Sequence, residues 1–184
     1  FLLLTSVLIS FNLWTNDRTF EVFPIIKWIS FPYYLSKLIQ LILVAILFVL
    51  ICCPKPKYIK ILCVLFILLI LEDQMRLQPW VYFYLLVLLP FISTKEKNTI
   101  VNYLRILFIG TYIWSGFFKF NPNFDHLIFE SILIDGLRIY DPITIYSIKS
   151  FAFVIPIIEI LMAIFLLFHR TRKIGVGLSI SSHL

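Results

Sequence analysis

This sequence has few charged residues. Only 14% of its 184 residues are Asp, Glu, Lys or Arg, whereas about a quarter of a typical soluble domain is charged. The hydrophobic share is 61% and the mean hydropathy is +0.98. A water-soluble fold of this size cannot hide so much apolar surface, so we expect the chain to lie in lipid.

Familiar catalytic and metal-binding patterns are also missing. The sequence has no G-x-S-x-G, H-E-x-x-H or P-loop pattern. Cys52, Cys53 and Cys63 form no C-x-x-C pair, and His126 and His183 stand on separate segments, so we predict no metal site. We expect the cysteines to be small packing residues; lipid modification of the adjacent pair is the alternative.

The apolar residues come in long runs. A spanning helix needs about 20 apolar residues, and five runs meet this length or can extend to it: 35–53, 58–71, 79–92, 100–118 and 151–168. Apolar runs at 1–14 and 175–184 are incomplete, so we expect a chain cut at both ends. The predicted fold is all-α: one polytopic transmembrane helical bundle over 1–184, with about five complete spans and two truncated ones.

Two prolines mark positions within these runs. Pro79 suits the first turn of a helix, where its missing N–H is not needed. Pro156 stands inside the run 151–168, where we expect it to kink the helix.

Charge sorts the connecting segments into two sets. The segments 54–60, 93–98 and 169–173 hold eight basic residues and one acid, whereas eight acids fall in 15–34, 72–78 and 119–150. The positive-inside rule places the basic set in the cytoplasm, and we expect a bacterial inner membrane. Topology therefore explains the net charge of +6, and we expect the lipid bilayer, not nucleic acid, as the partner.

The first polar cluster is the short segment from Glu72 to Trp80. It places Glu72, Asp73 and Arg76 between two apolar runs, more polar groups than a solvated turn needs. These three residues and Trp80 are candidate binding residues. The alternative is an interfacial turn with Trp80 as its aromatic anchor.

The second cluster follows one helical face. Arg105, Tyr112, Ser115 and Lys119 share a face at helical spacing, and Gly116 lets another helix approach closely. We predict that Tyr112 and Ser115 bind a ligand and that Lys119 is catalytic, because a lysine shielded from water loses its proton more readily and can act as a base. The alternative is a lysine that snorkels to the interface.

Glu159 is the third feature, because it stands near the middle of a predicted span. A carboxylate there is costly unless it is paired, protonated or functional. Lys119, Arg76 and Arg105 are the candidate partners, and Glu159 is a further candidate binding residue. A purely structural ion pair or a neutral carboxyl group is the alternative.

Two stretches resemble the DoxX/DoxD-like membrane proteins. One is Ser115-Gly116 followed by Lys119, Asn121-Pro122 and Phe124, which is similar to the "SG-x-x-K-x-x-P-x-F" helix end of that family. The other, from Pro156 to Lys173, looks like its next helix, with a glutamate before a leucine-rich stretch and a basic turn. The resemblance implies a quinone or thiol redox partnership, often with a separate catalytic subunit.

The segment Asp73-Gln74 to Trp80 and the additional N-terminal helices are similar to the HTTM domain, which is related to the membrane part of vitamin K-dependent γ-carboxylase. That resemblance implies that Lys119 is a base acting on reduced vitamin K. Three hypotheses follow. An outward-facing pocket lined by Arg76, Lys119 and Glu159 binds a quinone or another redox partner; or Lys119 serves a carboxylase-like enzyme; or the protein is a structural or assembly subunit.

Overall fold

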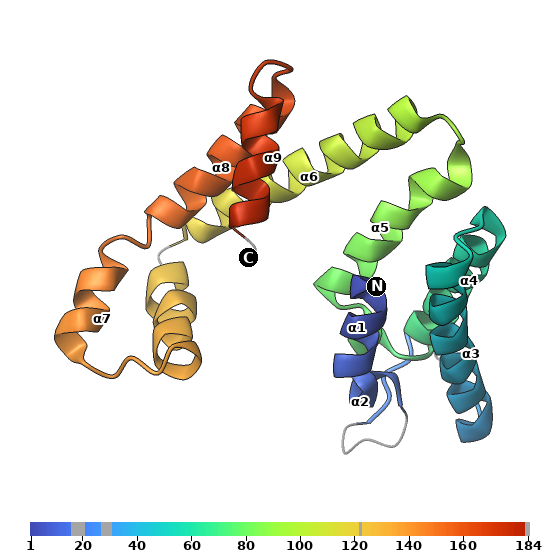
Figure 1. Cartoon of the computed structure of the whole chain (residues 1–184). Helices are drawn as coiled ribbons and strands as arrows, with labels where there is room; N and C mark the ends of the chain where they lie inside the picture. Colours follow the sequence, from blue (N-terminus) through green and yellow to red (C-terminus); the bar gives the residue numbers. More distant parts are fainter. Residues whose placement is uncertain (16–20, 27–30, 122, 183–184) are drawn as a thin grey trace. The chain divides into compact units, whose positions relative to one another are not determined.

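A computed structural model describes residues 1–15, 21–26, 31–121 and 123–182, without the side chains of 125–127. All regular secondary structure in these ranges is helical, as predicted (Figure 1). The chain divides into two compact units, Phe1–Ile100 and Val101–Leu184. A single domain over the whole chain stays a prediction.

The first unit is a group of helices from the N-terminal half. Its elements are α1 (Leu2–Ile9), α2 (Phe11–Trp14), α3 (Tyr33–Cys52), α4 (Pro56–Glu72), the 3₁₀ turn η1 (Gln74–Arg76) and α5 (Pro79–Ser93). Pro79 is in the first turn of α5, which confirms its predicted position. The following helix, α6 (Lys97–Lys119), begins at the end of this unit.

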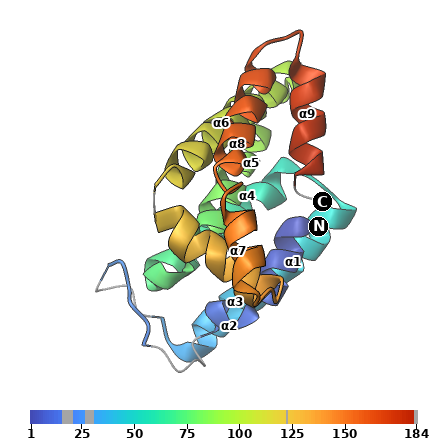
Figure 2. The same cartoon turned by 90° about the vertical axis from the view of Figure 1, so that its left-hand side faces the viewer.

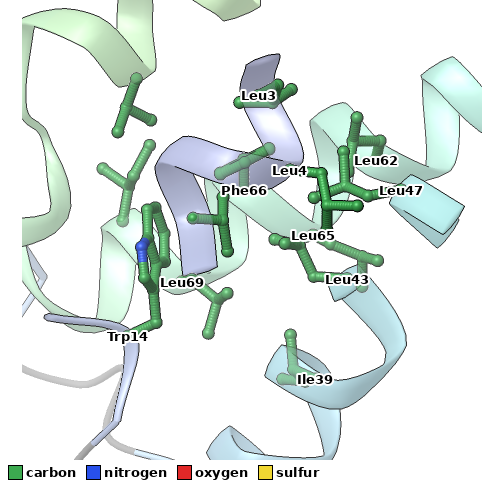
Figure 3. Packing of buried hydrophobic residues seen from close by; sticks show 13 residues of the cluster. Leu3, Leu4, Trp14, Ile39, Leu43, Leu47, Leu62, Leu65, Phe66 and Leu69 are labelled. Carbon is green, nitrogen blue, oxygen red and sulfur yellow. The ribbon is translucent and has the colours of Figure 1, made fainter. Parts of the chain in front are cut away.

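Leucine-rich faces form the core of the first unit. Ile39, Leu43 and Leu47 recur every four residues on α3, so they lie on one face of that helix. They pack against buried leucines of α4 (Figure 3). Trp14 closes the core from α2, with its ring edge-on to Phe66 at a centroid distance of 5.3 Å.

The second unit contains most of α6 and the C-terminal helices. Its further elements are the π-helical segments η2 (Phe124–Phe129) and η3 (Ile132–Gly136), then α7 (Pro142–Lys149), α8 (Val154–Leu167) and α9 (Arg172–Ser181). In Figures 1 and 2, α8 and α9 run side by side as a hairpin next to α6. A Cβ added to Gly175 would lie 2.8 Å from the Leu166 nitrogen, so the hairpin depends on a residue without a side chain there.

Large apolar side chains cover the outside of both units. On α6, Trp114 is 77% exposed and Phe117 is 64% exposed. Exposure of this kind along whole helices is unusual for a protein dissolved in water. It is expected where lipid surrounds the helices, so the protein is an integral membrane protein.

The predicted count of five complete spans is wrong for the described residues. Three helical stretches are long and apolar enough to cross a membrane: Tyr33–Cys52, Lys97–Lys119 and Pro142–Leu167. At 1.5 Å per residue, the 17 residues of α4 and the 15 of α5 reach about 26 Å and about 23 Å, less than the roughly 30 Å of a hydrocarbon core. Because α4 and α5 are consecutive, the predicted sides of the remaining segments do not change.

The segment 119–150, predicted to be a loop, contains η2, η3 and α7. Asp141 begins α7, since its carboxylate accepts a hydrogen bond from the Thr144 backbone N–H at 2.8 Å. Pro156 lies in the first turn of α8 rather than kinking a longer helix, because the chain already turns at 150–153. Residue Pro122 of the DoxX-like motif and residues 16–20 of the acidic segment lie outside the described residues.

Candidate functional site

The strongest candidate site joins α6 to α8. Lys119, at the end of α6, donates a hydrogen bond to the Ser115 hydroxyl at 3.1 Å and forms an ion pair with Oε1 of Glu159 on α8. The side chains of Lys119 and Glu159 are 22% and 14% exposed, so other protein atoms cover most of the surface of both. Of the three predicted partners of Glu159, the structure therefore selects Lys119.

Gly116 explains why the two helices come close enough for this pair. A Cβ at that position would lie 2.7 Å from Cγ1 of Ile160 and 3.0 Å from the carbonyl oxygen of Pro156. Real Cβ atoms do not approach other atoms so closely, so a larger residue would push α6 and α8 apart. The predicted role of Gly116 is confirmed.

The pair leaves hydrogen-bonding capacity unused. A lysine ammonium has three N–H donors, and among the described residues Ser115 and Glu159 accept only two. Oε2 of Glu159 is buried and has no described hydrogen-bond partner. The Phe124 ring lies 5.9 Å from Nζ of Lys119 and adds a flat apolar surface. One donor, one acceptor and one aromatic face thus lie together within the second unit.

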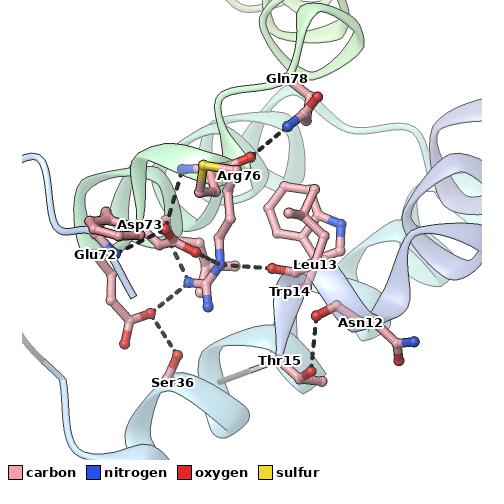
Figure 4. A network of polar contacts seen from close by, with 12 residues as sticks. Asn12, Leu13, Trp14, Thr15, Ser36, Glu72, Asp73, Arg76 and Gln78 are labelled. Atoms are coloured by element: carbon pink, nitrogen blue, oxygen red, sulfur yellow. Dashed lines mark hydrogen bonds and ion pairs between the residues drawn. The ribbon is translucent and has the colours of Figure 1, made fainter. Parts of the chain in front are cut away.

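The Glu72–Trp80 segment forms a separate network inside the first unit (Figure 4). The Arg76 side chain is fully buried, and its Nη1 lies 2.6 Å from Oε2 of Glu72. The same Glu72 oxygen accepts a hydrogen bond of 2.6 Å from Ser36 on α3. Nε of Arg76 lies 3.7 Å from Asp73 and donates to the Leu13 carbonyl oxygen at 3.3 Å.

This Arg76 network connects elements that are distant in the chain. Through Leu13 it ties the end of α2 to the turn after α4, and through Ser36 it adds α3. Trp80 lies against Trp14, with ring centroids 5.9 Å apart, so it extends the core of this unit. The geometry here is that of a satisfied structural network rather than an open site.

The shared pocket expected for Arg76, Lys119 and Glu159 stays a prediction, because Arg76 belongs to one unit and the other two residues to the other. Two residues of the predicted α6 face, Arg105 and Tyr112, line a different cavity of about 520 Å³ in the second unit. Arg172 also lines it, and sequence reasoning assigned Arg172 only to a cytoplasmic turn.

A smaller cavity lies in the first unit. Its volume is about 240 Å³, and its lining includes Lys37 and Gln40 of α3, which the sequence did not single out. The described residues contain no cluster of three His, Cys, Asp or Glu side chains that could hold a metal ion. The side chain of His126 and residue His183 lie outside the described residues.

Fold and site together define a helical integral membrane protein with an ion pair between two helical stretches, Lys97–Lys119 and Pro142–Leu167, that are long and apolar enough to cross a membrane. Residues 97–182 match the family model of the methylamine utilisation protein MauE, a family of membrane proteins. The match covers just under half of the chain and includes Lys119, Glu159 and all of α6, α8 and α9. No curated protein and no solved structure matches this chain.

Proposed function

We propose that this protein is the membrane-embedded part of a redox system, in a bacterial cytoplasmic membrane, and that the Lys119–Glu159 pair binds the headgroup of a quinone. The observation that carries the proposal is the incomplete pairing of this site. Lys119 keeps one N–H without a described acceptor, and Oε2 of Glu159 is buried without a described donor.

A quinone matches these unused groups. Its carbonyl oxygens accept hydrogen bonds, which suits the remaining N–H of Lys119. Its reduced form carries hydroxyl groups that donate, which suits Oε2 of Glu159. The buried Phe124 ring, 5.9 Å from the ammonium, adds an aromatic neighbour to the apolar surroundings that a quinone ring favours.

Two similarities support a redox role. The region that contains Lys119 and Glu159 is similar to the methylamine utilisation family. The same region resembles DoxX-type proteins, whose quinone or thiol partnership involves a separate catalytic subunit. We therefore propose that a second protein exchanges electrons with the bound quinone.

The competing roles of this site receive less support. A carboxylase-like base at Lys119 must reach a proton of its substrate, but Nζ of Lys119 is already engaged by the Ser115 hydroxyl and the Glu159 carboxylate. A purely structural pair should leave no buried polar atom without a partner, and none of the buried side-chain atoms of Arg76, Glu72 and Asp73 lacks one. The buried Oε2 of Glu159 has no described partner, which favours a ligand.

The test measures binding of decylubiquinone to the purified full chain in detergent. We expect Lys119→Met and Glu159→Gln each to weaken binding at least about tenfold, because a hydrogen bond to a charged group contributes about 1.5–3 kcal/mol. Unchanged affinity in both variants would reject the proposal.

A matched control comes from the second ion pair of the same unit. Lys149 lies 2.8 Å from Glu130, outside the proposed site. Lys149→Met and Glu130→Gln remove the same chemical groups and should leave quinone affinity unchanged. Circular dichroism of every variant separates lost binding from lost folding.

A further inference from the structure

The second unit contains a large cavity that the proposed quinone site does not use. It has a volume of about 520 Å³ and is lined by α6, by α9 and by Leu166 of α8. Pockets of about 300–1,000 Å³ hold ligands of drug size. The cavity is therefore large enough for part of a lipid molecule.

The lining is apolar except at a few points. Its apolar lining includes Val101 and Phe108 of α6 and Val176 and Ile180 of α9. A wall of this composition suits a hydrocarbon chain, since burial of each CH₂ group is favourable. A small soluble ion has no apolar surface that such a wall could stabilise.

Two arginines give the cavity a positive charge. Arg105 of α6 and Arg172 of α9 both line it, and no acidic residue does. Neither arginine forms an ion pair with any described residue. Nε of Arg172 is buried and lacks a described hydrogen-bond acceptor.

A buried guanidinium N–H without an acceptor is costly, so an acceptor is expected from outside the chain. Arg172 is also the first residue of α9, where the positive end of the helix dipole favours an anion. Arg105 stands eight residues into α6, about 12 Å from its start, so its long side chain can extend toward the same end.

We propose that this cavity binds an anionic phospholipid. The phosphate accepts hydrogen bonds from Arg172 and Arg105, and one acyl chain lies along the apolar wall between α6 and α9. The turn before Arg172 belongs to the predicted cytoplasmic side. Basic pockets between membrane helices on that side are known places for acidic lipid headgroups.

The test is native mass spectrometry of the full chain, released from detergent after incubation with phosphatidylglycerol or phosphatidylcholine. We expect phosphatidylglycerol to be retained about tenfold better, and Arg105→Gln/Arg172→Gln to abolish this preference. Arg170→Gln/Lys173→Gln is the matched control. It removes the same charge from exposed residues beside the cavity and should leave lipid binding unchanged.

Three results would overturn the proposal. Equal retention of both lipids would show an apolar site without charge selection. Equal loss in the control variant would show diffuse attraction to basic residues. Full displacement of the lipid by inorganic phosphate would identify a site for a soluble anion.

A second variant tests the same cavity independently, in case the arginine double variant does not fold. Val176→Trp adds bulk to the apolar wall and leaves both arginines in place. We expect it to lower phosphatidylglycerol retention about tenfold, because the acyl chain loses its space. Normal retention in Val176→Trp would also overturn the proposal. Quinone affinity measured on the same variants should stay unchanged, which separates this site from the Lys119–Glu159 pair.

Discussion

The Lys119 ammonium on α6 and the Glu159 carboxylate on α8 form an ion pair although 40 residues separate them in the chain. Protein atoms cover most of each side chain, so each charged group depends on the other for compensation of its charge. Removing one partner leaves the other uncompensated, whereas removing both leaves no charge behind.

We therefore predict non-additive stability effects at this pair. Lys119→Met and Glu159→Gln should each destabilise the protein by about 1–3 kcal/mol, and the double variant by less than the sum, with a coupling of about 1 kcal/mol. Unfolding in mixed detergent micelles measures all four proteins. The Lys149–Glu130 pair is the control and should couple more weakly, because its carboxylate is 37% exposed whereas that of Glu159 is 14% exposed. Additive effects at Lys119 and Glu159 would contradict the prediction.

The second prediction concerns the two glycines of α6. Gly116→Ala should destabilise the protein by about 1–3 kcal/mol, because its Cβ would meet Ile160 at 2.7 Å and the Pro156 backbone at 3.0 Å. Gly110→Ala is the matched control on the same helix, since a Cβ there meets nothing within 4 Å. It should be neutral, or stabilising by up to about 1 kcal/mol. Thermal denaturation in detergent compares the two, and equal effects would refute the close helix contact.

The third prediction concerns the buried Arg76 network. Arg76→Met should destabilise the protein by about 3–5 kcal/mol, since it leaves the carboxylates of Glu72 and Asp73 buried without their cation. Arg138→Met, at an exposed position, should change stability by less than about 0.5 kcal/mol. Chemical unfolding of both variants is the measurement. A small effect of Arg76→Met would mean that water or lipid headgroups reach this network.

Local rules predicted the parts of the site that depend on one helix. The spacing of Arg105, Tyr112, Ser115 and Lys119 placed them on one face, and the structure keeps the hydrogen bond from Lys119 to Ser115 one turn away. The cost of a lone carboxylate in a span predicted that Glu159 is paired, protonated or functional, and the structure shows it paired with Lys119. Because charge and distance along a helix are readable from the residues, these features could be found without coordinates.

Features that depend on packing could not be found in this way. The apolar runs 58–71 and 79–92 are short in the sequence, but the residues around them do not show how far each helix extends, so both were expected to reach the length of a span. From the sequence, Arg172 was predicted only to be one member of the basic segment 169–173. Its place in a cavity depends on the α8–α9 hairpin, which requires Gly175 to meet the backbone near Leu166.

The fourth prediction tests which side of the membrane the basic segments occupy. Cys52 ends α3 and Cys53 follows it, and both thiols are exposed next to the basic segment 54–60. Their exposure contradicts the expected packing role and makes them natural probes. An impermeant maleimide should label them in inverted membrane vesicles but not in intact cells, because the positive-inside rule puts this segment in the cytoplasm.

Two variants complete the topology experiment. Cys52→Ser/Cys53→Ser should remove nearly all labelling, since Cys63 lies within α4 and is half-buried. Asn121→Cys, introduced into the variant without Cys52 and Cys53, places an exposed thiol just beyond the C-terminal end of α6. It should react only in intact cells, because a helix of 23 residues reaches about 35 Å and so crosses the bilayer. Labelling of Cys52, Cys53 and Asn121→Cys from the same side would show that α6 does not span, and the reverse pattern would invert the whole topology.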